Sequence, residues 1–350
     1  MISSIRLQNF RSYDDRTFEF GDGVNVIVGP NAAGKTNLLE SVLVVCSGGS
    51  FKARDCEMVK NGAEWMRLDA DTSVGKRTTK IIVEPLPSKS YDLDGKILSR
   101  LLPSRTIPTV LFEPNHLFLL SGSPDARRKY LDDLIEKTDL SFYATRNHYK
   151  RVLAQRNSLL KNNSPHLLND IFVWNFRLSE LGGQIAKKRF ELVEELNAQL
   201  SNIYSEISGK PSQIRLDYLS KFHPKNYETE LLKKLEHNLD KETQRGYTLY
   251  GPHRDDFEAQ MDGQPMQVVS SRGEVRTMVL TLKILELIQI QNARNQKPIF
   301  LLDDVFSELD STRRAALARY TQTHQTFITT TDSDMLASGA NINQIFIGKQ

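Results

Sequence analysis

The sequence predicts an α/β fold built from two sequence halves with a helical insertion between them. Three observations predict it. A glycine-rich turn at residues 29–36 lies between an apolar segment, 24–28, and a helical segment that begins at Lys35. Residues 124–208 have helical periodicity and contain only two prolines. Residues 299–302 form an apolar run that ends in two aspartates, as a buried strand would.

Composition and charge are those of an ordinary globular chain and exclude several classes of protein. The 350 residues are 39% apolar and 25% charged, with a formal net charge of +3, a balance too weak to argue for nucleic-acid binding by itself. Cys46 and Cys56 form no CxxC pair, so neither a disulfide scaffold nor a zinc site is expected. With no apolar leader and no apolar run that could span a bilayer, we expect a cytoplasmic protein without membrane contact.

Patterns along the chain divide it into three parts. Residues 1–122 have strand patterns on both sides of the helical segment that begins at Lys35, and residues 123–243 are helical. Strand patterns resume over residues 244–350, with a helix after Glu274. The helical part carries an apolar stripe at spacings of three and four, made of Val193, Leu196, Leu200, Ile203 and Ile207. Because this stripe lasts only about two heptads, we expect a short antiparallel helical arm and not a long coiled coil.

The glycine-rich turn has the pattern GxxxxGK[ST] between a strand and a helix, as a phosphate-binding loop requires. The candidate nucleotide-binding residues are Gly29, Pro30, Asn31, Ala32, Ala33, Gly34, Lys35 and Thr36. Glycines let backbone N–H groups surround phosphate oxygens, and the helix N-terminus adds partial positive charge. Lys35 would reach the β- and γ-phosphates, and the Thr36 hydroxyl would ligate Mg²⁺. A chance glycine-rich turn is the alternative, against which the full match and both flanks argue.

The apolar strand at residues 299–302 supplies the carboxylates that a phosphate loop needs opposite it. Asp303 is the expected Mg²⁺ partner. Asp304 is placed to act as general base on the attacking water, which makes it the candidate catalytic residue. A pair of surface aspartates at the end of a strand is the alternative.

A short polar turn, SRGE at residues 271–274, precedes the helix that leads into the acidic strand. The order of phosphate loop, long insertion, this turn, acidic strand and a following ELD turn resembles the ABC-type ATPases. That resemblance implies that Ser271 and Gly273 bind the γ-phosphate of ATP held by a second subunit. Glu274 would begin the helix whose dipole faces that charge. An ordinary helix cap by Ser270 or Ser271 is the alternative.

Longer stretches are similar to the RecF family of SMC-like proteins. The chain opens with IRLQNFRSY at residues 5–13, which resembles the start of SMC-like heads. Residues 114–132 and 247–257 resemble RecF in particular, with a departure at Asn115, where an acid is usual. Together with the nucleotide motifs, the resemblance covers essentially the whole chain and identifies it as a member of the RecF family.

The resemblance implies a P-loop ABC-type ATPase head built from two sequence halves, with an inserted helical lid. It implies an ATP-dependent homodimer that binds single-stranded and duplex DNA without sequence preference, with ATP and Mg²⁺ as cofactors. The expected role is recombinational repair and replication of gapped DNA, with RecO and RecR as partners that help to load RecA and support the SOS response. By similarity to SMC-like heads, Arg11 would contact the nucleotide.

Two departures from ABC transporters predict slow hydrolysis. Those enzymes carry a glutamate where this chain has Asp304, whose side chain is one methylene shorter. They also carry a histidine after the next strand, where this chain has threonines at residues 329–331, and His324 comes too early. We expect a weak ATPase whose hydrolysis is regulatory and whose primary role is DNA binding.

Two groups of basic residues are candidates for contacts with DNA phosphates. The chain has no acidic residue between Ser141 and Asn169. The candidates in that stretch are Arg146, Lys150, Arg151 and Arg156. A second group, in the N-terminal sheet region, includes Lys52 and Arg54. Such contacts would be blind to sequence and sensitive to salt; a solvated helical face is the alternative.

Other functions fit part of the pattern. A P-loop kinase unrelated to DNA would explain the phosphate loop and the acidic strand but would leave residues 271–274 without purpose. An ABC-type ATPase subunit of a transporter would be expected to carry a glutamate in place of Asp304 and a switch histidine. A third alternative is a non-enzymatic DNA-binding scaffold in which ATP only gates assembly. It differs from the favoured function only in how much ATP hydrolysis contributes, since slow hydrolysis is there a release step.

The cluster His253-Arg254-Asp255-Asp256 could be taken for a metal or acid–base site. Four successive residues of a strand alternate between its faces, so they cannot all converge on one ion. We expect a structural role for this cluster, linking the helical insertion to the ATPase head.

Overall fold

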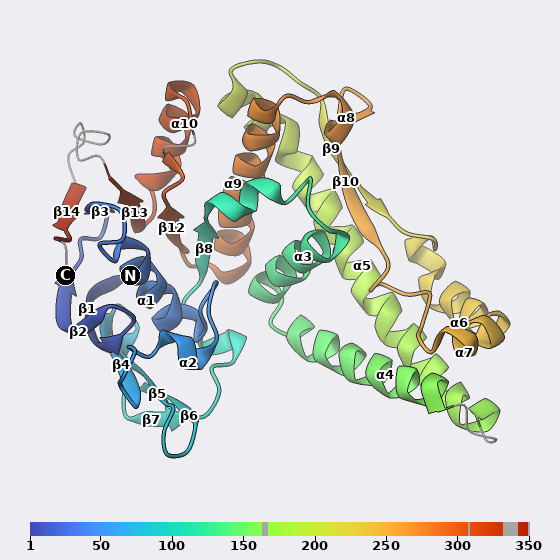
Figure 1. Ribbon diagram of the computed structural model, residues 1–350. Helices are drawn as coiled ribbons and strands as arrows, with labels where there is room; N and C mark the ends of the chain where they lie inside the picture. Colours follow the sequence, from blue (N-terminus) through green and yellow to red (C-terminus); the bar gives the residue numbers. More distant parts are fainter. Residues whose placement is uncertain (163–166, 307–308, 332–341, 349–350) are drawn as a thin grey trace. The chain divides into compact units, whose positions relative to one another are not determined.

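The computed structural model describes residues 1–162, 167–306, 309–331 and 342–348 (Figure 1). The chain forms two compact units. The first contains Met1–Leu117, Ile207–Gly209 and the described chain from Leu280 onward, and the second contains Phe118–Glu206 and Lys210–Val279. No helix among the described residues is long and apolar enough to cross a membrane.

The centre of the first unit is a five-stranded parallel sheet with the strand order β14-β3-β13-β12-β8. Its strands are β3 (Val24–Val28), β8 (Thr109–Phe112), β12 (Ile299–Asp303), β13 (Thr326–Thr330) and β14 (Ile342–Phe346). Every residue of β3, β12 and β13 is buried, as expected for strands covered on both faces. Because parallel strands end at the same edge, the loops that follow β3 and β12 lie together.

A second, six-stranded sheet has the order β2-β1-β4-β5-β6-β7 and is antiparallel throughout. Its strands are β1 (Ile2–Phe10), β2 (Tyr13–Glu19), β4 (Trp65–Thr72), β5 (Gly75–Ile82), β6 (Ser88–Leu93) and β7 (Lys96–Leu98). Ile5 and Leu7 of β1 alternate with exposed Arg6, so one face of this sheet is apolar.

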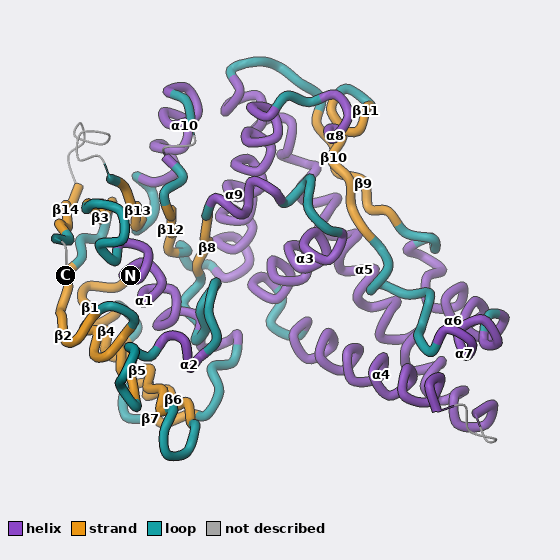
Figure 2. Tube along the Cα trace, in the orientation of Figure 1, coloured by secondary structure: helices purple, strands orange, loops and turns teal. Residues whose placement is uncertain are grey.

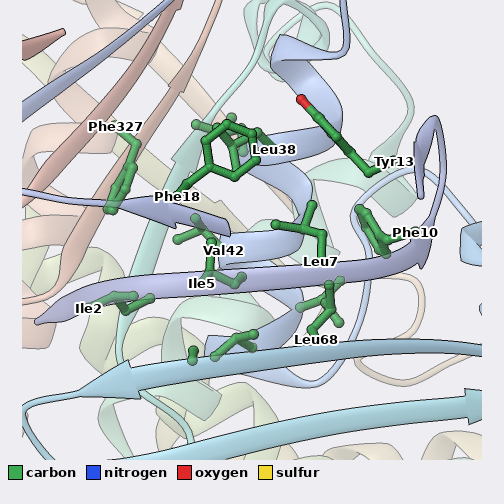
Figure 3. Close-up of a cluster of buried hydrophobic side chains, with 14 of the residues drawn as sticks. Ile2, Ile5, Leu7, Phe10, Tyr13, Phe18, Leu38, Val42, Leu68 and Phe327 are labelled. Carbon is green, nitrogen blue, oxygen red and sulfur yellow. The ribbon is translucent and has the colours of Figure 1, made fainter. Parts of the chain in front are cut away.

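Helix α1 (Lys35–Ser47) joins the two sheets through one hydrophobic core. Figure 3 shows Ile5 and Leu7 of β1 beside Leu38 and Val42 of α1, all four fully buried. Burial of each such side chain contributes about 1.5–3 kcal/mol, enough to fix the start of α1 against both sheets. The rest of the helical structure in this unit comprises α2 (Asp55–Met58), η1 (Pro103–Arg105), η2 (Pro114–Phe118), α10 (Ser311–Thr321) and the later part of α9 (Arg272–Arg294).

The second unit is mainly helical, as Figure 2 shows. Its helices are α3 (Pro124–Thr138), α4 (Phe142–Asn162), α5 (Leu167–Ser208), α6 (Tyr227–His237), α7 (Leu239–Arg245) and α8 (Met266–Val269), with a 3-10 turn, η3 (Pro224–Asn226). The five residues of the predicted apolar stripe all lie on α5 and are buried. The arm is longer than its heptads suggested, because α5 runs for 42 residues.

A small sheet shifts the end of the second unit from residue 243, where it was expected, to Val279. Strand β9 (Ile214–Leu219) lies inside the stretch read as helical, and it pairs antiparallel with β10 (Asp256–Met261), which in turn pairs with β11 (Gln264–Pro265). A strand of six residues between long helices is too short to stand out in a helical pattern. Its pairing with β10 holds the residues after 243 in this unit.

The cluster at residues 253–256 has a structural role within the second unit, to which its printed partners belong. The expected link to the head stays a prediction. The Asp255 carboxylate accepts hydrogen bonds from the Tyr218 and Tyr227 hydroxyls at 2.7 and 2.8 Å. Asp256 forms a two-pronged ion pair with Arg127 of α3. The cluster therefore ties a helix, the small sheet and α6 together.

His253 is the titratable group in this cluster that is best placed to sense pH. Its Nδ1 lies 2.7 Å from the Tyr149 hydroxyl and its Nε2 lies 3.2 Å from the Thr248 carbonyl oxygen. A neutral ring with its proton on Nε2 satisfies both contacts, since Nδ1 then accepts from the phenol. Burial lowers the pKa of His253 to about 4.

We predict that the second unit loses stability as the pH falls from 7 to 5. Over this range the unfolded chain binds a proton at His253, whereas the folded chain stays unprotonated there. The contribution of this residue to the free energy of unfolding therefore falls by about 2 kcal/mol. Urea unfolding of the wild type and His253→Gln at both pH values measures it. The glutamine variant should be less stable at pH 7 but less dependent on pH.

The matched control is His148→Gln, which changes an exposed histidine of the same unit. It should leave the pH dependence of unfolding as it is in the wild type. Equal pH dependence in the wild type and His253→Gln would contradict the prediction.

Candidate nucleotide-binding site

The phosphate loop follows β3 directly and runs into α1, as the sequence predicted. Lys35 is the first residue of α1, and its side chain is folded back over the loop. Its Nζ donates to the main-chain carbonyls of Gly29 and Pro30 at 3.0 and 3.1 Å, and the residue is only 5% exposed. The ammonium is thus held against the loop by two neutral carbonyl acceptors. Phosphate oxygens carry negative charge and accept stronger hydrogen bonds, so they would replace these carbonyls when a nucleotide binds.

Gly34 occupies the point in the loop where no other residue fits without strain. Its φ of +98° is in the left-handed region, and a Cβ there would lie 3.0 Å from the Tyr13 hydroxyl and 3.1 Å from the Ser12 Oγ. The Tyr13 hydroxyl donates to the Gly34 carbonyl at 3.1 Å, and burial raises the pKa of Tyr13 to about 12. The turn after β1 therefore supports the loop through a phenol that stays neutral.

Thr36 and Asp303 form the contact that closes the site. The Thr36 hydroxyl donates to Asp303 Oδ1 at 2.9 Å, although the two residues are 267 positions apart in the chain. Asp303 is the last residue of β12 and is 8% exposed. The register of the parallel sheet is what brings the loop after β3 beside the end of β12, since β13 pairs with both.

The donor set of this contact fits magnesium. A threonine hydroxyl and a carboxylate are hard oxygen ligands, and Mg²⁺ is commonly held by one or two such groups with phosphate and water completing its shell. Among the described residues no group of three or more His, Cys, Asp or Glu side chains is arranged to hold a metal. A cation at Thr36 and Asp303 would therefore take most of its coordination from nucleotide and solvent.

Asp304 leaves β12 in a left-handed backbone conformation, with φ +50°. Its main-chain N–H donates to the Thr329 hydroxyl at 2.8 Å. Burial, and then the neighbouring charge of Asp303, raises the pKa of the Asp304 carboxyl. A carboxylate with a raised pKa is a better proton acceptor than an ordinary one, which suits the general-base role proposed for it.

Arg11 has a protein partner in the place of the predicted nucleotide contact. Its Nε and Nη2 donate to both carboxylate oxygens of Glu40 on α1 at 2.9 and 2.8 Å, and its Nη1 donates to the Glu57 carbonyl. Glu40 is fully buried and also accepts from the Ser50 hydroxyl. Contact of Arg11 with nucleotide stays a prediction, which requires Arg11 to exchange Glu40 for phosphate.

The SRGE turn at residues 271–274 forms a capping box at the start of α9. The Ser271 N–H and hydroxyl both donate to Glu274 Oε2, at 2.7 and 2.8 Å, and the Glu274 N–H donates back to the Ser271 Oγ at 3.3 Å. The helix-cap alternative is therefore realised in this structure, and it uses Ser271 and Glu274 but leaves Gly273 without a purpose. Ser271 and Arg272 are exposed.

The ELD turn after the acidic strand lies partly outside the described residues, which exclude Ser307 and Glu308. Leu309 is buried, and Asp310 caps α10 by accepting from the Arg313 N–H at 2.9 Å. The described part of the turn thus starts the next helix.

Comparison with known proteins decides the family. The family model described as RecF/RecN/SMC N terminal domain matches residues 1–350. The DNA replication and repair protein RecF of Ruminiclostridium cellulolyticum is 31% identical over 368 residues, which cover 99% of this chain and 96% of that protein. RecF of Heliobacterium modesticaldum is 34% identical over 345 residues, with 94% and 92% of the two chains covered. The chain belongs to the RecF family.

Solved structures agree with this assignment. A structure of the recombination mediator protein RecF-ATPrS in the RecFOR pathway superposes with a TM-score of 0.88 at 29% identity, covering 100% of this chain and 98% of that one. An Smc head bound to the C-terminal winged-helix domain of ScpA superposes with a TM-score of 0.59 at 16% identity, covering 98% and 93%. The second match shows a shared fold. The family model and the RecF structure together confirm the predicted α/β ABC-type ATPase head.

Membership of the RecF family answers the alternatives that the motifs left open. A RecF-family chain is a DNA replication and repair ATPase, so neither a small-molecule kinase nor a transporter subunit is needed to explain the phosphate loop. The sequence has no histidine after β13, and the structure shows where the nearest one lies. Thr329 stands near the acidic strand, whereas His324 precedes β13, where it contacts the Tyr320 carbonyl and Gln291.

Two of the predicted DNA contacts in this RecF-family chain are wrong. Arg156 is fully buried and bonds Glu242, Asn175 and Thr248 within the second unit. The Arg146 side chain is 14% exposed and pairs with the carboxylates of α3, namely Asp132, Asp133 and Glu136. The acids that neutralise these two cations lie outside residues 141–169, on α3 and α7, so the lack of acids within that stretch was misleading.

The remaining candidates are on the surface. Lys150 and Arg151 of α4 are exposed, as are Lys52 and Arg54 before α2. Lys52 lies 3.9 Å from Glu40, so its charge is partly balanced. DNA contact by these four residues stays a prediction.

Three supporting residues of the site escaped prediction. Glu40 reads as one more charge on a helix, Tyr13 as the end of a family signature, and Thr329 as one of a run of threonines. A weak signal existed for Thr329, since residues 327–331 have the pattern of the strand that follows the acidic one. Only the register of that pairing, which puts Thr329 opposite Asp303, reveals its position.

We predict that Arg156 serves stability. Arg156→Ala leaves Glu242 buried and unpaired, which should lower the free energy of unfolding by about 3–5 kcal/mol. Lys150→Ala, an exposed change on the same helix, should lower it by less than about 0.5 kcal/mol. Urea unfolding of the two variants measures the difference, and similar losses in both would contradict the buried ion pair.

Proposed function

We propose that this RecF-family chain is an ATP-dependent DNA-binding protein of recombinational repair. ATP binding drives dimerisation, the dimer clamps single-stranded DNA or duplex next to a gap, and slow hydrolysis resets it. The protein acts with RecO and RecR to load RecA and supports the SOS response. The observation that carries the proposal is the bond between Thr36 and Asp303, which assembles a nucleotide site in a chain related along its length to DNA replication and repair proteins.

The first unit supplies the parts that bind nucleotide. Main-chain N–H groups of the phosphate loop and the N-terminus of α1 receive phosphate oxygens, and Lys35 moves from the Gly29 and Pro30 carbonyls to the β- and γ-phosphates. Thr36 and Asp303 hold Mg²⁺, which when bound neutralises phosphate charge. Asp304 accepts a proton from the attacking water.

The SRGE turn supplies the contact with a second copy of the chain. Ser271 is exposed, and its hydroxyl can exchange Glu274 for a phosphate oxygen with little change in bonding. Val268 and Val269, just before the turn, are 78% and 48% exposed. Apolar side chains beside a polar recognition group are typical of a surface that a partner covers.

The residue types at and near the acidic pair, Asp303 and Asp304, support slow turnover. The Asp304 carboxylate is carried on a side chain one methylene shorter than the glutamate of ABC transporters, and a threonine stands where a histidine would assist. ATP hydrolysis should be slow in the monomer and faster when DNA promotes dimerisation. Such kinetics suit a protein in which ATP hydrolysis limits how long DNA stays bound, and do not suit a motor that moves along DNA.

Sedimentation with and without ATP tests the dimer. We predict that the wild type shifts from monomer to dimer with ATP, whereas Ser271→Arg, which places a cation and bulk at the shared phosphate, stays monomeric. Ser158→Arg makes the same change on the exposed surface of α4 and should dimerise normally. A wild type that stays monomeric with ATP and DNA at high protein concentration would overturn the mechanism.

Lys35→Arg separates gating from turnover when sedimentation with ATP is combined with a measurement of phosphate release. Arginine keeps the charge and much of the ATP binding, so this variant should dimerise but hydrolyse ATP more slowly. A variant that hydrolyses ATP more slowly yet releases DNA as fast as the wild type would favour a scaffold that ATP only gates.

The salt dependence of DNA binding tests the surface cations. Each lost contact with a duplex phosphate should reduce the slope of log K against log[salt] by about 0.9. We predict that Lys150→Ala with Arg151→Ala reduces the slope and weakens binding to all sequences alike, measured by fluorescence anisotropy. Lys96→Ala, at an exposed position of the β6–β7 hairpin, is the control. An unchanged slope would remove this part of α4 from the DNA surface.

A further inference from the structure

Thr329 lies on the strand next to the acidic pair and faces it. Strand β13 pairs in parallel with β12, and the register places Thr329 opposite Asp303. Thr329 is fully buried, so its hydroxyl must find partners within the protein. Those partners are the two acidic residues that carry the chemistry of the site.

The hydroxyl of Thr329 makes two hydrogen bonds whose directions are fixed. The Asp304 main-chain N–H can only donate, so the Thr329 oxygen accepts at 2.8 Å. The single proton of the hydroxyl is then given to Asp303 Oδ1 at 2.9 Å. One side chain thus holds the carboxylate of the first acid and the backbone of the second.

The bond to Asp303 also affects Thr36. Asp303 Oδ1 accepts from Thr329 and from the Thr36 hydroxyl, each at 2.9 Å. Because the Thr36 proton points to Asp303, the lone pairs of the Thr36 oxygen are left for a cation. An aspartate held by Thr329 therefore orients a second residue that would ligate Mg²⁺.

The bond to Asp304 restrains an unfavourable backbone. A non-glycine residue with φ near +50° is strained by about 1–2 kcal/mol, less for aspartate than for most residues. The contact from the Asp304 N–H to Thr329 stabilises this conformation, in which the chain turns away from the strand. The direction in which the Asp304 side chain leaves the sheet depends on it.

Thr326, on the same strand, shows what a purely structural threonine does here. It is also fully buried, but its hydroxyl contacts the Thr321 and His324 carbonyl oxygens of the preceding turn. Those contacts secure the start of β13 and reach no group of the nucleotide site. Thr329 differs because both of its partners belong to the acidic pair.

We propose that Thr329 is a positioning residue of the nucleotide site, which sets the Mg²⁺-binding geometry of Asp303 and Thr36 and the placement of Asp304. This inference rests on the proposed nucleotide function. In ABC transporters a histidine in the loop after this strand assists at the nucleotide site. In this chain a threonine within the strand would position the acidic residues of that site.

Binding of a fluorescent ATP analogue in excess Mg²⁺ and in EDTA tests the proposal. Thr329→Val keeps the shape but removes the hydroxyl, and should weaken Mg²⁺-dependent binding by about 10-fold, as changes to the groups that orient metal ligands commonly do. Binding in EDTA should stay within about twofold of the wild type, because the phosphate loop is untouched. Thr329→Ser restores a hydroxyl and should restore most of the Mg²⁺ dependence.

Thr326→Val is the matched control and should leave binding in both conditions unchanged. If Thr329→Val weakens binding equally with Mg²⁺ and with EDTA, or behaves like Thr326→Val, Thr329 has only a structural role and the proposal is wrong. If Thr329→Val does not fold, Thr329→Ala is judged by the same two conditions. A wild type that binds the analogue equally well with and without Mg²⁺ would instead overturn the proposed metal site.

Discussion

The register of the parallel sheet is the constraint on which the rest of the nucleotide site depends. Strand β13 pairs with β3 on one side and with β12 on the other, so the ends of three strands far apart in sequence meet at one edge. The bond from Thr36 to Asp303 spans that edge. A slip of one residue in either pairing would turn Asp303 to the opposite face and separate the acid from the phosphate loop. The large apolar core around α1, in which residues of both sheets take part, makes such a slip costly.

The second unit is held together by a different kind of interaction. Arginines and acids that lie far apart in sequence pair inside it, as Arg156 does with Glu242 and Arg189 with Asp132. Buried pairs of this kind add little net stability, but each partner is strongly destabilising alone. They therefore select one arrangement of helices over others that would leave a charge unpaired, and β9 and β10 extend that selection to residues after the long helices.

The sequence predicted the loop after β3 and the acids at the end of β12, which the structure brings together, and much less of their surroundings. The phosphate loop and the acidic pair were found because their chemistry needs fixed residue types at fixed spacing, beside a strand and a helix. Arg146 and Arg156 were misread because the acids that neutralise them lie on other helices or 86 residues away, and a linear charge pattern carries no such information. Thr329 and Glu40 act through pairings between elements, so no local pattern distinguishes them from ordinary strand and helix residues.

Glu40 has a consequence for how the surface and the nucleotide site communicate. This buried carboxylate on the phosphate-loop helix binds Arg11 through two hydrogen bonds and lies 3.9 Å from Lys52. A ligand that drew Arg11 away would strengthen the attraction between Glu40 and Lys52. A polyanion that bound Lys52 would in turn strengthen the ion pair between Glu40 and Arg11. Linkage between two sites is reciprocal, so one shared carboxylate would make two such binding events compete through a common counter-charge.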